Sequence, residues 1–187
     1  MKKILLTSLL VITPCCVNAS EQNWNTYIGM NAGICASDVT VHDDDFFDFG
    51  GVYNFELGAR YKKRLRLALN YQSRAEVSEF FQILLGHSIA ITNDAIRVNG
   101  YYDYVSLNWF SMYIGAGVGG DRYSYKITNR ADNSTSSKHG FTFTGGVSTG
   151  LSFRLGQVHI DLGAIFDYIN EPRIYSYGPN LGIRYNF

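Results

Sequence analysis

Apolar and polar residues alternate along most of the chain, and the alternation is clearest over residues 175–187. One face of this segment carries Tyr and Phe near both ends and Leu and Ile between them, with Pro179 as the single exception. The other face carries Ser, Gly, Asn and Arg. A period of two indicates a β-strand. Rings at both ends of its apolar face are typical of a strand that crosses a bilayer, because Tyr and Phe favour the two interfaces.

Seven earlier segments repeat this pattern, so eight strands are expected. Their predicted positions are residues 27–37, 53–61, 65–72, 96–104, 112–127, 141–155, 158–168 and 175–187. The connections at residues 38–48, 75–88 and 128–139 are predicted to be long, and those after the second, fourth and sixth strands short. An even strand number with this asymmetry predicts an all-β fold, an eight-stranded antiparallel transmembrane β-barrel of the outer-membrane type.

Charges on the polar faces distinguish a membrane barrel from a soluble one. A soluble ligand-binding barrel turns its polar face to water, whereas a transmembrane barrel turns that face inward and its apolar face to lipid. Acidic and basic residues here are spaced by glycines, which suits a narrow interior of ion pairs, and Asp167 shares this face. The expected polar network of the interior consists of Glu56, Arg60, Arg66, Arg97, Asp103, Arg154, Asp161 and Arg184.

The first nineteen residues have the organisation of a secretory signal peptide. Two lysines precede a short apolar run, and residues 17–19 offer a small-residue cleavage site after Ala19. No apolar run reaches the roughly 20 residues that a membrane helix needs. We therefore expect residues 1–19 to be removed and residues 20–187 to form the barrel domain.

Cysteine and charge counts narrow the alternatives. A lipoprotein signal at Cys15 or Cys16 fits less well, because Pro14 stands before Cys15 where a small residue is expected. Removal of the signal peptide would leave Cys35 as the one cysteine, which cannot form a disulfide within the chain. It would also remove two lysines and change the formal net charge from 0 to −2. This near-neutral charge gives no argument for nucleic acid as a partner.

Three segments carry a family resemblance. Residues 99–103 (NGYYD), 113–119 (YIGAGVG) and 180–187 (NLGIRYNF) resemble the opacity-protein family of bacterial outer-membrane surface antigens, which are often described as porin-like. The resemblance implies an eight-stranded barrel in the outer membrane of a Gram-negative cell, in contact with outer-membrane lipid. It also implies recognition by the barrel-assembly machinery through the C-terminal strand ending in Phe187, and surface loops that bind a host-cell or extracellular ligand. It implies no catalytic residues and no cofactor.

One predicted connection is unusually apolar. Within residues 75–88, Phe80, Phe81, Ile83, Leu84 and Leu85 form a candidate partner-contact loop. An exposed apolar segment of this kind can mark a contact with a partner or a membrane surface. A plug over the barrel mouth, or an extension of the strands above the membrane, is the simpler interpretation.

Three features of the sequence could suggest a cofactor, metal or catalytic site, and we interpret each of them as part of the fold. Residues 115–120 satisfy the dinucleotide fingerprint G-x-G-x-x-G, but strand-like sequence follows where a helix should begin. The acidic residues of 38–48 lack the spacing of a calcium loop, so a solvated loop is expected rather than a metal site. Among the histidines, His159 is expected to face inward and to bond with Asp161.

The sequence therefore predicts a structural, adhesin-like surface protein whose loops are the interaction sites. A narrow-pore porin for small solutes is the alternative, and a lipid-modifying outer-membrane enzyme is a third hypothesis.

Overall fold

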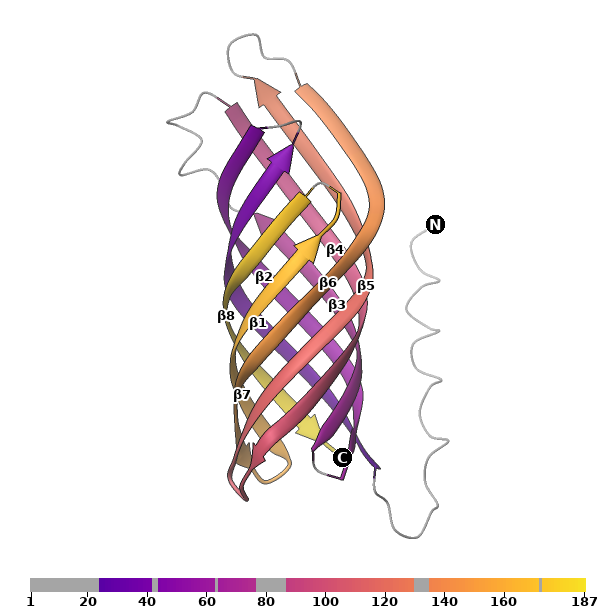
Figure 1. Ribbon diagram of the computed structural model, residues 1–187, viewed down its shortest axis with the longest axis vertical. Helices are drawn as coiled ribbons and strands as arrows, with labels where there is room; N and C mark the ends of the chain where they lie inside the picture. Colours follow the sequence, from indigo (N-terminus) through magenta and orange to yellow (C-terminus); the bar gives the residue numbers. More distant parts are fainter. Residues whose placement is uncertain (1–23, 42–43, 63, 77–86, 130–134, 172) are drawn as a thin grey trace, which may run out of the picture.

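The chain forms a closed antiparallel β-barrel, as Figure 1 shows. The computed structural model describes residues 24–41, 44–62, 64–76, 87–129, 135–171 and 173–187. The strands are β1 (Trp24–Val41), β2 (Asp44–Tyr61), β3 (Leu65–Glu76), β4 (His87–Ser106), β5 (Phe110–Asn129), β6 (Thr135–Leu155), β7 (Val158–Ile169) and β8 (Arg173–Asn186). The predicted fold class, strand number and antiparallel order are confirmed. No helix of the described part is long and apolar enough to cross a membrane.

Closure of the sheet depends on the pairing of β1 with β8. Their register runs from Tyr27 opposite Asn186 to Thr40 opposite Arg173. On its other edge β1 pairs with β2 along its whole length, from Trp24 opposite Tyr61 to Val41 opposite Asp44. Because the barrel has no free edge, most of its backbone N–H and C=O groups are satisfied between strands, which a lipid environment requires.

The two ends of the barrel differ. Short turns join β2 to β3, β4 to β5 and β6 to β7, and the chain ends at Phe187 on the same side (Figure 1). We call this end the inner mouth. A hydrogen bond from Arg64 N to Tyr61 O (3.0 Å) closes the first of these turns, and Gly156 takes a positive φ of 69° in the third. The opposite end, where residues 77–86 join β3 to β4 and residues 130–134 join β5 to β6, is the outer mouth.

Strands extend further toward the outer mouth than the sequence predicted. The loop predicted at residues 38–48 is mostly strand, since β1 continues to Val41 and β2 begins at Asp44. The loop predicted at residues 128–139 is also mostly strand, because β5 ends at Asn129 and β6 begins at Thr135. Cross-strand pairing satisfies the backbone groups of these polar segments regardless of side-chain polarity. The long first connection was therefore a wrong prediction.

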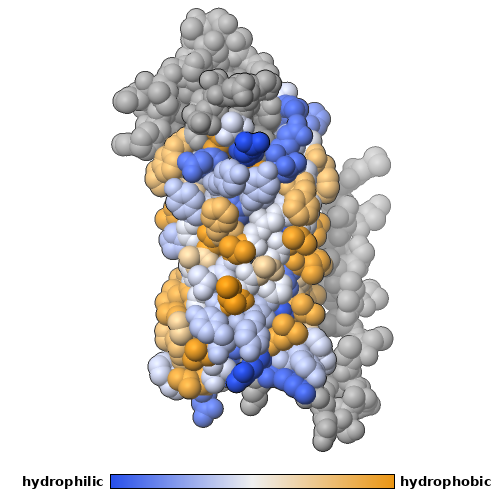
Figure 2. Space-filling view, viewed as in Figure 1, coloured by the Kyte–Doolittle hydropathy of each residue, from blue (hydrophilic) through white to orange (hydrophobic). Residues whose placement is uncertain are grey.

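The outer wall carries an apolar belt bounded by aromatic rings. Aliphatic side chains such as Ile34, Leu69 and Leu181 point outward at mid-height, and Figure 2 shows the most hydrophilic residues gathered near the two ends. Near the inner mouth, the rings of Trp24 and Tyr61 lie with centroids 4.9 Å apart. The inner ring belt comprises Trp24, Tyr61, Tyr104, Trp109, Phe110, Phe153, Tyr185 and Phe187, and the outer one Phe47, Phe49, Phe141, Phe143, Phe166, Tyr168, Tyr175 and Tyr177. This arrangement suits a bilayer with its two interfaces.

Candidate functional site

The inward face of the barrel is polar and densely filled. The structure places all eight residues of the expected polar network on this face. Most are buried, with Asp103 at 0% and Arg184 at 1% exposure, whereas Arg154 and Asp161 are half-buried. Their contacts separate into a cluster near the inner mouth, a middle layer, and a cluster nearer the outer mouth.

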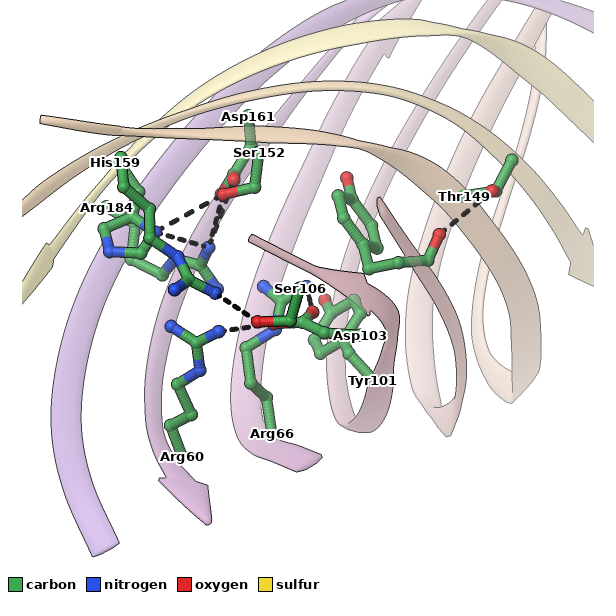
Figure 3. A network of polar contacts seen from close by, with 12 residues as sticks. Arg60, Arg66, Tyr101, Asp103, Ser106, Thr149, Ser152, His159, Asp161 and Arg184 are labelled. Atoms are coloured by element: carbon green, nitrogen blue, oxygen red, sulfur yellow. Dashed lines mark hydrogen bonds and ion pairs between the residues drawn. The ribbon is translucent and has the colours of Figure 1, made fainter. Parts of the chain in front are cut away.

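The inner cluster is organised around two carboxylates. Asp103 on β4 accepts hydrogen bonds from Arg60 Nη2 (2.5 Å) and Arg66 Nη2 (3.1 Å). On the opposite wall, Arg184 Nη2 donates to Asp161 Oδ1 (3.1 Å) and also to the hydroxyl of Ser152 (3.0 Å). Figure 3 shows these groups converging from several strands. Two of the three ion pairs in this cluster share the Asp103 carboxylate. Asp103 therefore offsets the positive charge of one arginine on β2 and one on β3.

Aromatic faces hold two of these guanidinium groups from the side. The Arg66 guanidinium lies 4.7 Å from the ring centroid of Tyr101 and 4.7 Å from that of Tyr113. Arg184 lies 5.2 Å from the centroid of the Tyr27 ring. Such cation–π contacts stabilise a desolvated guanidinium, and they fix the planes of both groups within the interior.

The middle layer surrounds a small cavity. The Tyr101 hydroxyl donates to Glu56 Oε2 (3.1 Å) and accepts from Asn99 Nδ2 (3.1 Å). Asn54 Nδ2 donates to Asn31 Oδ1 (2.6 Å). The cavity has a volume of about 60 Å³ and is lined mainly by Asn, Gln, Glu, Arg and Tyr side chains. It has room for a few water molecules, but it is far below the roughly 300–1,000 Å³ of ligand pockets.

Asp167 on β7 organises the outer cluster. It accepts hydrogen bonds from Arg97 Nη1 (2.6 Å), Arg74 Nη2 (2.7 Å) and Gln72 Nε2 (2.9 Å). Arg97 also donates to the Thr144 hydroxyl (2.9 Å). The sequence analysis missed Arg74, although it continues the inward series of Arg66, Asn70 and Gln72. It was missed because the third strand was predicted to end at residue 72, whereas β3 continues to Glu76.

An apolar layer lies beyond the outer cluster, which the sequence analysis did not predict. Val39, Ile169 and Ile174 are buried, and the register places Ile174 opposite both Val39 and Ile169. Val52 on β2 is also buried, and the Cys35 thiol, which forms no disulfide, lies 3.5 Å from the carbonyl oxygen of Gly50. Cys35 thus packs as a small apolar residue.

Of the remaining candidates, the structure describes His159 but not the candidate partner-contact loop. Phe80, Phe81, Ile83, Leu84 and Leu85 lie outside the described residues, so their role stays a prediction. His159 faces inward, but its Nδ1 lies 3.4 Å from Ser152 Oγ and 3.4 Å from Arg184 Nη2 rather than against Asp161. Within the described ranges, no three His, Cys, Asp or Glu side chains are grouped to hold a metal ion.

Comparisons with known proteins agree with this architecture. The chain matches the family described as outer membrane protein beta-barrel domain over residues 7–187. Neisserial surface protein A (NspA) superposes with a TM-score of 0.66 at 20% identity, covering 87% of this chain and 97% of that one.

Two further solved structures share the fold. Ail, the attachment invasion locus protein of Yersinia pestis, solved with the heparin analogue sucrose octasulfate, has a TM-score of 0.55 at 12% identity, covering 87% of this chain and 99% of that one. A major outer membrane protein from Thermus thermophilus has a TM-score of 0.52 at 14% identity, covering 87% and 99%. No curated protein sequence matches the chain. At these identities the structural likeness shows the fold alone.

Proposed function

We propose, because the chain belongs to the outer membrane protein β-barrel family, that it is a structural, adhesin-like surface protein of the opacity type. The family places the protein in the outer membrane. With the short turns toward the periplasm, as in other barrels of this kind, the inner mouth faces the periplasm and the outer mouth faces the cell exterior. The barrel is then a rigid mount, and the interaction sites are the connections at the outer mouth.

The observation that carries this proposal is the filled interior. Two clusters of arginine and carboxylate side chains occupy the lumen at different heights, and the cavity between them measures about 60 Å³. A continuous path for solutes would have to separate buried ion pairs, which is costly because each charge would lose its partner. The interior therefore favours a mount over a pore.

The outer ends of the strands support the same proposal. β4, β5 and β6 are 20, 20 and 21 residues long, about twice the 9–11 residues that cross a bilayer. Residues 77–86 and 130–134 join strands at this mouth. The long paired strands extend the barrel wall well beyond the length that a bilayer requires. Ail, one of the structural neighbours, was solved with a heparin analogue bound, so heparin is a reasonable first probe in a binding screen.

We also propose that the last strand serves as the recognition element for barrel assembly. Phe187 N donates to Thr26 O (3.0 Å), and the Phe187 ring contacts that of Tyr185 edge-on with centroids 5.2 Å apart. The Phe187 side chain is 67% exposed. An aromatic ring that stays accessible next to the closing strand pair is available to a partner during insertion.

Conductance measurements distinguish the proposed rigid mount from the narrow-pore porin alternative. The purified mature protein, reconstituted in a planar bilayer, is expected to give no steady current steps, because the two ion-pair clusters close the lumen. A general porin in the same bilayer serves as the positive control. Steady, voltage-independent channels from this protein would overturn the proposal and favour the narrow-pore porin.

A second prediction concerns the candidate partner-contact loop. Replacing Phe80 and Phe81 together by Ser is expected to lower attachment of expressing bacteria to cultured host cells by about tenfold, since aromatic anchors dominate contact surfaces. The matched control replaces Asn133 and Ser134 by Ala in the neighbouring connection. A heat-dependent change in gel mobility verifies that each barrel is assembled. Unchanged attachment with an assembled barrel would eliminate this loop as the contact.

A further inference from the structure

The inner cluster contains more positive than negative charge. Its guanidinium groups belong to Arg60, Arg66, Arg154 and Arg184, and its carboxylates to Asp103 and Asp161. The next acid inward, Glu56, accepts its hydrogen bond from the Tyr101 hydroxyl. Counting Glu56 still leaves one guanidinium in excess. Buried like charges without counter-charges are costly, so the excess calls for an anion.

Arg154 is the guanidinium without an acid. Its Nη2 donates to the hydroxyl of Ser106 (2.9 Å), and no carboxylate of the described residues lies within the 4.0 Å of an ion pair. Its Nε is buried and has no hydrogen-bond partner. Arg154 lies two residues before the turn at Gly156 and is half-buried, so part of its side chain is exposed at the inner mouth.

Polar groups near Arg154 also have buried atoms without a hydrogen-bond partner among the described residues. Arg184 is 1% exposed, yet its Nε and Nη1 have no partner. The hydroxyl of Ser111 is buried at 0% exposure and also has none. The register places Ser111 opposite Ser106 on one side and Ser152 on the other, and Ser152 already accepts from Arg184. A row of three hydroxyl groups thus lies across β4, β5 and β6, between strands that carry arginines.

Guanidinium and hydroxyl donors together are the chemistry of oxyanion recognition. A guanidinium presents parallel N–H groups that match two oxygens of a phosphate or carboxylate, and serine hydroxyls donate to the remaining oxygens. Water could satisfy the hydrogen bonds, but it would leave the charge excess in place. An oxyanion satisfies both.

We propose that the inner mouth binds a small oxyanion, a phosphate or carboxylate group, between Arg154 and Arg184 and against the hydroxyls of Ser106 and Ser111. The site is distinct from the surface connections to which the adhesin-like function is assigned. It gives the periplasmic side of the barrel a ligand-binding role, and occupancy neutralises the inner cluster.

The test measures thermal unfolding of the mature protein in detergent, using the temperature at which half of the protein loses its compact gel mobility. Parallel samples contain sodium phosphate, sodium acetate or sodium chloride at equal ionic strength and pH. We expect phosphate, acetate or both to raise the midpoint by about 4 °C over chloride. The salt that raises the unfolding midpoint identifies whether the site prefers a phosphate or a carboxylate.

Substitutions test whether the oxyanion-dependent shift arises at the proposed site. Arg154→Gln is expected to abolish the oxyanion shift. Ser111→Ala is expected to reduce it without lowering the midpoint in chloride, because the Ser111 hydroxyl has no hydrogen-bond partner among the described residues. Arg173→Gln, an exposed arginine at the opposite end, is expected to retain the full shift. Absence of a shift in the unsubstituted protein, an undiminished shift in Arg154→Gln, or loss of the shift in Arg173→Gln as well would each overturn the proposal.

Discussion

Replacing Asp103 by Ala is expected to lower the free energy of unfolding by about 3–5 kcal/mol, the range found when one partner of a buried ion pair is removed. Asp103 is fully buried and forms ion pairs with both Arg60 and Arg66. Its loss leaves two buried guanidinium groups of the inner cluster without this carboxylate. Urea titration of the barrel in detergent or lipid vesicles measures the change.

The matched control for this substitution is Glu171→Ala. Glu171 also forms an ion pair, with Lys138 at 3.1 Å, but the two side chains are 61% and 52% exposed. An exposed pair contributes about 0–1 kcal/mol, so Glu171→Ala is expected to change stability by less than about 1 kcal/mol. Equal, small effects of the two substitutions would show that the inner cluster contributes little to the stability of the barrel.

Gly178→Val is expected to destabilise the barrel by about 3 kcal/mol, at the upper end of what overpacking costs. A Cβ at Gly178 on β8 would collide with the carbonyl oxygen of Ile34 and lie 3.0 Å from Cys35 Cα on β1. Both obstacles are backbone atoms, so the closing strand pair would have to separate. The same stretch already lacks ladder pairing between Gly33–Asn180 and Ala36–Tyr177, next to Pro179, which has no N–H to donate.

Gly145→Val on β6 is the control for the glycine prediction. The nearest atom to a Cβ there is the Gly117 carbonyl oxygen at 3.5 Å, an ordinary contact. Because Val suits a strand better than Gly, Gly145→Val is expected to leave the urea midpoint unchanged or raise it. A tolerated Gly178→Val would mean that β1 and β8 can separate at this point without loss of closure.

The sequence predicted the direction of side chains well because direction follows from a local rule. Successive residues of a strand point to opposite faces, so alternation around Arg66, Arg97 and Asp103 was enough to place them inside a barrel. The same rule located the lipid-facing residues of β8. Strand ends were predicted less well, because polar residues near the outer mouth look like loop sequence although they pair as strands.

The partners within the interior could not be predicted from alternation. Asp167 and Arg74 are 93 residues apart in the chain, and Asp103 and Arg60 are 43 apart. Such pairs depend on the register of every intervening strand, since a shift of one residue turns a side chain to the other face. Arg154 was predicted as one member of the interior polar network, and the absence of an acid within ion-pair distance among the described residues became visible only from the contacts in the folded barrel.

By itself, the sequence determined the class of the molecule: an eight-stranded barrel with an apolar outside, a charged inside and aromatic residues at the interfaces. These properties follow from the period of two and from the need to face lipid with apolar groups. The tertiary structure alone decided which charges meet, that ion-pair clusters lie at two heights of the interior, and that Arg154 has no carboxylate of the described residues within ion-pair distance. The physical reason is that closure joins the first strand to the last, so contacts across the lumen are fixed by the whole barrel and by no single segment.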